Sequence, residues 1–123
     1  MDKKNKVLID LTYLQEVASD NTDFMVEMID IFLAQTPDYI SILQDAIASE
    51  DLPKIAEMAH KIKPTLAFMG ANEAKEAMGF IEHRARIKED YNGIVTDFKQ
   101  LSADFGDIIL GLQEKRKELL ARG

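Results

Sequence analysis

The sequence has no cysteine, and it has only three prolines and six glycines among 123 residues. Without cysteine, the chain cannot form a disulfide framework, a thiolate zinc site or a cysteine nucleophile. The absence of cysteine also fits a reducing compartment. Because residues that interrupt helices are rare and helix-forming residues dominate, the composition favours an all-α fold.

The sequence also lacks the signals of membrane, secreted and nucleotide-binding proteins. No apolar run approaches the ~20 residues that a membrane-spanning helix needs, and no apolar segment of a signal peptide follows the polar residues 1–5. There is neither a P-loop motif nor a glycine-rich ATP site. The net charge of −7 argues against nucleic acid or anionic lipid as a partner. We therefore expect a cytoplasmic protein that binds neither nucleic acid nor membranes and is not itself a kinase.

The apolar residues are numerous enough for one folded domain. They make up 46% of the chain, as is typical of globular proteins, and a chain of this length can bury a core without disulfides or metals. No internal repeat, linker or low-complexity segment is evident. Residues 1–123 are therefore predicted to form a single domain, which we expect to be a monomer.

Apolar residues recur at intervals of three and four along most of the chain, the periodicity of amphipathic helices. One short helix and four long ones are predicted, over residues 11–18, 22–48, 52–70 and 73–88, and from about residue 94 to the C-terminal end. Pro37 lies inside the second helix and predicts a kink near residues 33–36. Four long helices with short connections predict an antiparallel up-down four-helix bundle, and the short N-terminal helix would cover one end.

His60 has an unusual position on the helix predicted over residues 52–70. At ~100° per residue, the large apolar side chains of this helix gather on the side opposite His60, namely Ile55, Met58, Ile62, Leu66 and Met69. The imidazole is therefore expected to face solvent. Most of its neighbours on the exposed face are small or basic; they are Ala56, Glu57, Lys63, Pro64 and Ala67. Such a face leaves room for another surface to approach the ring.

The residue types around His60 suit phosphoryl chemistry. A neutral imidazole is a nucleophile at nitrogen, and imidazole is largely neutral at cellular pH. A phosphoryl group on His60 would bring about two negative charges, which Lys63 and Lys61 could counter. The helices on either side of Gly70 form a hairpin, which returns Glu82 to the level of His60. A carboxylate there could accept a hydrogen bond from one ring nitrogen, fix the tautomer and leave the other nitrogen free to react.

The run AHKIKPTLAFMG, residues 59–70, resembles the signature of histidine-containing phosphotransfer (HPt) domains. In order, the signature has a histidine, an aliphatic residue, a lysine, a first glycine, a small hydroxyl residue and a second glycine at fixed spacing. All of these except the first glycine are matched here, by His60, Ile62, Lys63, Thr65 and Gly70. Ile81 and Glu82 match the aliphatic-acidic pair of the family on the following helix. Pro64 departs from the pattern, because the family usually has the first glycine at this position. The glycine is interpreted as leaving room for the partner protein.

The resemblance implies a phosphorelay intermediate of two-component signalling, a phosphoprotein without autokinase activity. It implies that His60 accepts a phosphoryl group from the aspartyl phosphate of a response-regulator receiver domain and passes it to another receiver. Lys63 and Lys61 would stabilise the phosphate, and Glu82 would orient the ring. A hybrid sensor kinase is a further implied partner; the chain itself would need no cofactor, since the receiver supplies Mg²⁺. Receivers would dock over Ala56, Pro64, Ala67, Phe68 and Gly70.

The same surface has two other interpretations. A helical adaptor could dock receiver domains or other helices there without carrying phosphate. The pair Glu57 and His60 has the spacing of half a carboxylate-bridged di-iron site, but no second such pair exists and this one faces away from the predicted core, so no metal site is predicted. Three basic residues of the next helix are interpreted as a solvated face that could also steer an acidic receiver: Arg84, Arg86 and Lys88. His83 is interpreted as a solvated residue, with a role at the site as the alternative.

Overall fold

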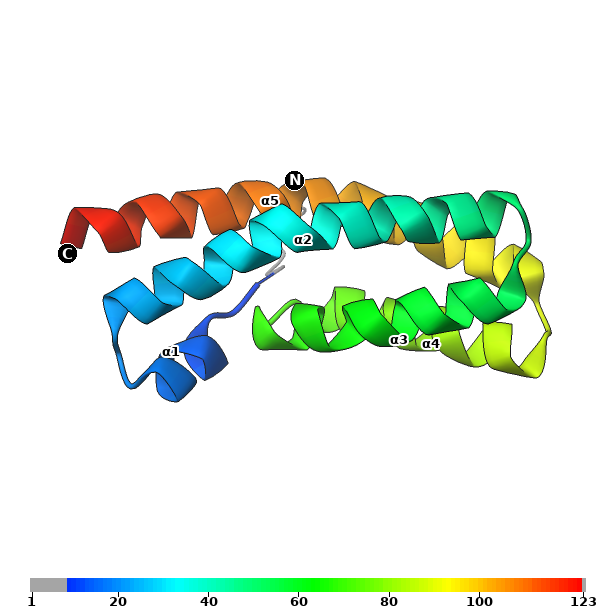
Figure 1. Cartoon of the computed structure of the whole chain (residues 1–123), viewed down its shortest axis with the longest axis horizontal. Coiled ribbons are helices and arrows are strands. Elements are labelled where there is room, and N and C mark those ends of the chain that lie inside the picture. The colour runs from blue at the N-terminus through cyan, green and yellow to red at the C-terminus, as the bar shows by residue number, and fades with distance from the viewer. Residues whose placement is uncertain (1–8, 123) are drawn as a thin grey trace, which may run out of the picture.

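The computed structural model describes residues 9–122, and within that range all regular structure is helical. The helices are α1 (Thr12–Ala18), α2 (Thr22–Ala48), α3 (Leu52–Phe68), α4 (Asn72–Ile87) and α5 (Tyr91–Arg122), shown in Figure 1. The all-α prediction is confirmed, and so is the number of helices. No helix within the described range combines the length and the apolar character needed to cross a bilayer.

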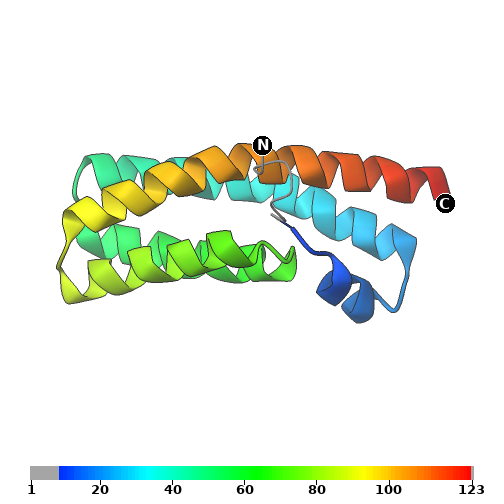
Figure 2. The ribbon, with the colours of Figure 1, turned by 180° about the vertical axis from the view of Figure 1, so that it is seen from behind.

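The four long helices form the predicted up-down bundle. Each of α2 to α5 runs opposite to the helix before it, and the α3/α4 hairpin packs against one half of the α2/α5 pair (Figure 1). The first half of α2 and the last half of α5 continue beyond the hairpin, and α1 lies beside this extension; the view from behind agrees (Figure 2). The hairpin thus has one face in the bundle and one face open to solvent.

Short polar side chains set where the helices begin. The Asp10 carboxylate accepts hydrogen bonds from the backbone and hydroxyl of Thr12, Asn21 accepts one from the Phe24 amide, and Asp51 accepts one from the Lys54 amide. Each satisfies a backbone donor that the first turn leaves free. At α4, which begins at Asn72, the cap position is occupied by Ala71, and no side chain accepts a capping hydrogen bond there.

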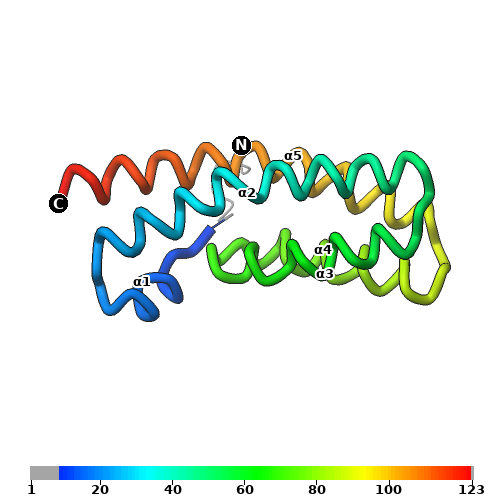
Figure 3. Tube along the Cα trace, in the orientation of Figure 1, coloured from blue at the N-terminus to red at the C-terminus, as the bar shows by residue number. Residues whose placement is uncertain are grey.

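Two features of α2 depend on its neighbours in the bundle. The helix is continuous through Pro37, and its axis changes direction near the middle, as predicted (Figure 3). A spacing of three and four along this helix predicts Phe24, Met28 and either Ile31 or Phe32 on the core side. Phe24 and Met28 are partly buried against the core and Phe32 is 4% exposed, whereas Ile31 is 42% exposed. Ile29 is fully buried as well, in the half of α2 that packs against α1 and α5 (Figure 1).

The connection after α3 requires glycine at position 70. Gly70 has a φ of +67°, and a Cβ atom there would lie 1.8 Å from the carbonyl oxygen of Asp10. The close approach brings the segment before α1 against the end of α3, where the Asp10 amide donates to the Met69 carbonyl. Gly70 therefore ends α3 and admits the N-terminal segment, since only glycine has both the conformation and the space.

Candidate functional site

His60 lies on α3 with its imidazole in solvent, as the helical periodicity predicts. Its side chain is 68% exposed, whereas all five apolar residues predicted on the opposite side of α3 are buried. The bundle covers that opposite side, so the ring projects from the open face of the hairpin. The imidazole is accessible to a partner as large as a protein.

Glu82 of α4 lies directly beside the ring. Its Oε2 atom is 3.0 Å from His60 Nδ1, and its Oε1 atom accepts a hydrogen bond of 3.0 Å from Lys63 Nζ. Although Glu82 is only 7% exposed, no buried side-chain oxygen or nitrogen in the described range lacks a partner. The α3/α4 hairpin thus brings together the three residues His60, Lys63 and Glu82, as the sequence predicted.

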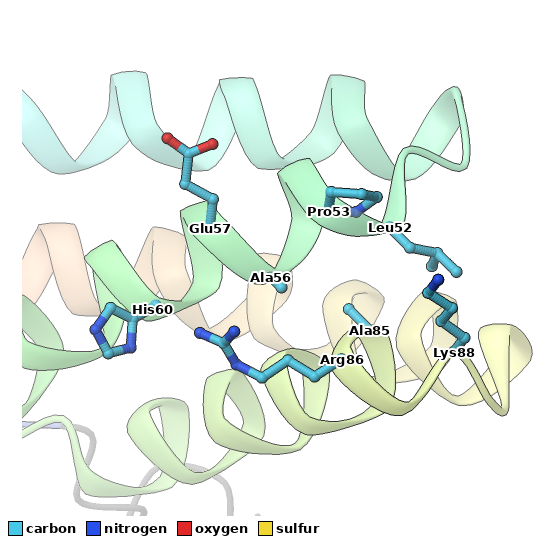
Figure 4. A pocket seen from close by; sticks show the side chains of 8 residues that line it. All are labelled: Leu52, Pro53, Ala56, Glu57, His60, Ala85, Arg86 and Lys88. Carbon is cyan, nitrogen blue, oxygen red and sulfur yellow. The ribbon is translucent and has the colours of Figure 1, made fainter.

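Arg86 completes the set of groups around Glu82. Its guanidinium donates to Glu82 Oε2 from both Nε and Nη2, at 3.0 and 2.7 Å, and Figure 4 shows it directed toward His60. Arg86 was predicted on a solvated face, and this contact was not predicted. The spacing of four residues between Glu82 and Arg86 was the available signal, because residues four apart on a helix are neighbours.

The protonation state of Glu82 determines the tautomer of His60. Burial alone would raise the pKa of the Glu82 carboxyl, but the hydrogen bonds from Arg86 and Lys63, the charge of Lys63 and the hydrogen bond from His60 together lower it from 4.5 to about 2. The carboxylate is therefore ionised near neutral pH and can only accept hydrogen bonds. His60 Nδ1 must carry the proton, and Nε2 of the neutral ring keeps its lone pair available for reaction.

The depressed pKa of Glu82 predicts a pH-dependent stability. Because the folded-state pKa is the lower one, ionised Glu82 stabilises the fold above pH 4.5, and this stabilisation is lost as the pH falls toward 2. We expect Glu82→Gln to unfold with a free energy about 2 kcal/mol below wild type at neutral pH, since the exposed cations screen part of the full effect. This difference in the free energy of unfolding should vanish at low pH, where Glu82 is protonated in both the folded and the unfolded protein.

Urea unfolding of both proteins across that pH range measures this difference. Glu57→Gln is the matched control, since the Glu57 side chain is 65% exposed and forms an exposed ion pair with Lys54, at 3.7 Å. A constant difference between wild type and Glu82→Gln at all pH values would contradict the assignment.

Other polar residues near the site have their own partners. The Lys61 ammonium lies 5.1 Å from the centroid of the Tyr39 ring on α2, so it is directed to the opposite flank of α3 from Glu82. Arg84 forms ion pairs with Asp97 and Asp90. The phosphate-stabilising role of Lys61 stays a prediction that requires its side chain to leave Tyr39.

The residues predicted for partner docking differ in exposure. Pro64 is exposed, and Ala67 and Gly70 are partly exposed. Ala56 has only 6% of its surface exposed, in a hollow that His60 also lines. Phe68 is partly buried against the core and makes an edge-on contact with Tyr13 at 5.8 Å between ring centroids. Their docking roles stay predictions.

Fold and site together define a class of protein. A helical bundle presents the imidazole of His60 to solvent, and buried Glu82 fixes the tautomer of that ring. The cations of Lys63 and Arg86 lie beside the same carboxylate, close enough to contact a group transferred to the ring. Within residues 9–122, no three potential metal-ligating side chains form a group. This arrangement is that of a phosphocarrier.

Comparison with known proteins places the chain in a family. Residues 27–113 match the Hpt domain, and the chain belongs to the Hpt domain family. The domain is accordingly a phosphocarrier of histidine phosphotransfer in phosphorelays and not a kinase, and Hpt domains interact with receiver domains of two-component systems.

A solved structure has a similar fold. The chain resembles histidine-containing phosphotransfer protein B (HptB) from Pseudomonas aeruginosa PAO1 with a TM-score of 0.78, over 90% of this chain and 96% of that one, at 18% sequence identity. The similarity concerns the bundle, since so low an identity supports the fold alone. No curated protein sequence matches the chain.

Proposed function

We propose that His60 accepts a phosphoryl group from the aspartyl phosphate of one receiver domain and passes it to the aspartate of another. The observation that carries the proposal is the exposed imidazole whose Nδ1 is held by ionised Glu82. Family membership supplies histidine phosphotransfer as the reaction class. We retain the predictions that residues 1–123 form one domain and that it acts as a cytoplasmic monomer.

The chemistry follows from the tautomer. The lone pair of His60 Nε2 attacks phosphorus, an N–P bond forms, the bond between phosphorus and the aspartyl oxygen breaks, and its electron pair leaves with the receiver carboxylate. The ring then carries the phosphoryl group on Nε2 and a proton on Nδ1, hence a positive charge. Glu82 stabilises that charge through its contact with Nδ1, as a carboxylate stabilises imidazolium in other nucleophilic sites.

Lys63 and Arg86 serve the incoming phosphoryl group. In the unmodified protein both donate to Glu82, and their side chains are 38% and 55% exposed. A phosphoryl group on Nε2 adds negative charge next to them, and charge-assisted hydrogen bonds to phosphate are strong. We propose that Lys63 and Arg86 then donate some of their hydrogen bonds to the phosphate. Mg²⁺ on the receiver would supply the remaining charge neutralisation.

The proposal is tested by supplying two kinds of donor. Wild-type protein is incubated with phosphoramidate, and separately with a panel of receiver domains charged by acetyl phosphate. We expect an adduct that is labile in acid and stable in base, from phosphoramidate and from at least one receiver, and transfer onward when a second receiver is added. Receiver binding without any adduct would contradict the proposal and support the helical adaptor.

A further inference from the structure

A groove on the surface of the α3/α4 hairpin begins at His60. It has a volume of about 540 Å³ and runs from the ring toward the start of α3 and the end of α4 (Figure 4). The docking residues predicted from the sequence lie mainly on the other side of His60, toward the end of α3. The groove shows that the open face also has a hollow on the N-terminal side of the ring.

The groove exists because its two helices present small side chains to each other. Ala56 of α3 and Ala85 of α4 line it and are 6% and 2% exposed. Leu52 and Pro53 continue the apolar lining toward the start of α3. The lining is therefore apolar enough to accept an aliphatic or aromatic side chain, and burial of such a side chain favours binding.

The charged residues along the groove are mainly basic. Arg86 and Lys88 of α4 line it, with Arg86 next to His60 and Lys88 at the far end (Figure 4). Glu57, the one acidic lining residue, is directed away from Arg86 in Figure 4 and pairs with Lys54. A partner with carboxylates beside an apolar side chain is complementary to this lining.

The charges of the chain are divided unevenly between the α3/α4 hairpin and the other residues. Residues 52–88, which form the α3/α4 hairpin, contain seven Lys or Arg and four Asp or Glu, a net charge of +3. The chain as a whole has −7, so the other residues carry −10. An acidic partner is attracted to the hairpin and repelled by the remaining surface, which orients its approach.

We infer that a receiver domain seats an apolar side chain, flanked by carboxylates, in the groove between His60 and Lys88, and that this groove determines which receivers the protein serves. The inference rests on the proposed function, since it concerns the protein that delivers or takes the phosphoryl group. Continuity with His60 and charge complementarity are the reasons for assigning the groove to the receiver.

Filling the groove tests the inference. Ala56→Leu occupies part of its volume, and both residues favour helices. Ala103→Leu, on the exposed face of α5, is the matched control. With a receiver that transfers to wild type, we expect Ala56→Leu to lower kcat/KM about tenfold, mainly through KM. The control should stay at the wild-type value. Both variants should accept phosphate from phosphoramidate at the wild-type rate, which also shows that they are folded.

A charge reversal supplies a second, independent test. Lys88→Glu is compared with Lys117→Glu, which makes the same change in net charge on the exposed side of α5. We expect Lys88→Glu to lower the rate of phosphoryl transfer from the receiver about fivefold at low salt, and this difference from wild type should be lost at high salt. Lys117→Glu should have little effect on the rate.

The outcomes separate the inference from the proposed function. If both Ala56→Leu and Lys88→Glu take phosphate from the receiver at the wild-type rate, the docking role of the groove is overturned and the role of His60 is unaffected. A wild-type protein that takes no phosphate from phosphoramidate would instead overturn the proposed function.

Discussion

The His60→Gln variant is expected to form no acid-labile phosphoryl adduct with any donor. Glutamine has roughly the reach of histidine but no nucleophilic nitrogen, so the N–P bond cannot form. His60 is exposed and lies outside the core, so the bundle should fold as in wild type. Phosphate incorporation from phosphoramidate and from a charged receiver, followed by acid treatment, measures the loss.

His83→Gln is the matched control, because His83 is the other histidine of the chain and is exposed on the same hairpin. This variant should be phosphorylated like wild type. An adduct that persists in His60→Gln would reject the assignment of the phosphorylated residue. Unchanged receiver binding by His60→Gln is compatible with the assignment, since docking and chemistry use different groups.

Glu82→Ala is expected to slow phosphoryl transfer to His60 about a hundredfold, the size typical of a lost acid-base or orienting partner. Without the carboxylate, the ring loses its preference for the proton on Nδ1, and the cationic ring of the product loses its counter-ion. Glu82→Gln keeps an oxygen that can accept from Nδ1 and loses only the charge. We expect transfer by this variant to fall about tenfold.

A direct measurement of the ring distinguishes this positioning role from a structural one. Nitrogen NMR of His60 should show the proton on Nδ1 in the wild-type neutral ring and in Glu82→Gln, and a mixture of tautomers in Glu82→Ala. Equal transfer rates in wild type and Glu82→Ala, with tautomers unchanged, would show that Glu82 does not orient the ring.

Most of the fold could be predicted because it depends on local periodicity. Spacings of three and four place the helices and the buried side of α3, and they put His60 on the opposite side. The proximity of Glu82 to His60 was also predictable, since a short turn at Gly70 aligns the two helices of a hairpin. Periodicity along single helices and one short turn were sufficient for these predictions.

Contacts between distant parts of the chain could not be predicted in the same way. Spacing along α2 left Ile31 and Phe32 as alternatives for the core, and the helices that cover α2 bury Phe32. Phe68 is partly buried against the core and contacts Tyr13 on α1, and the Lys61 ammonium lies over the Tyr39 ring on α2. Each depends on a residue far away in the sequence.

The sequence by itself determined that this protein is a helical bundle in which the imidazole of His60 points outward with a lysine beside it, because helical periodicity is a property of neighbours along the chain. Only the tertiary structure decided that three basic groups converge on one buried carboxylate, and that a groove with a basic lining opens next to the ring. Those features arise where α3 and α4 pack together. How closely the two helices approach each other depends on the volumes of the side chains that both of them place in the contact.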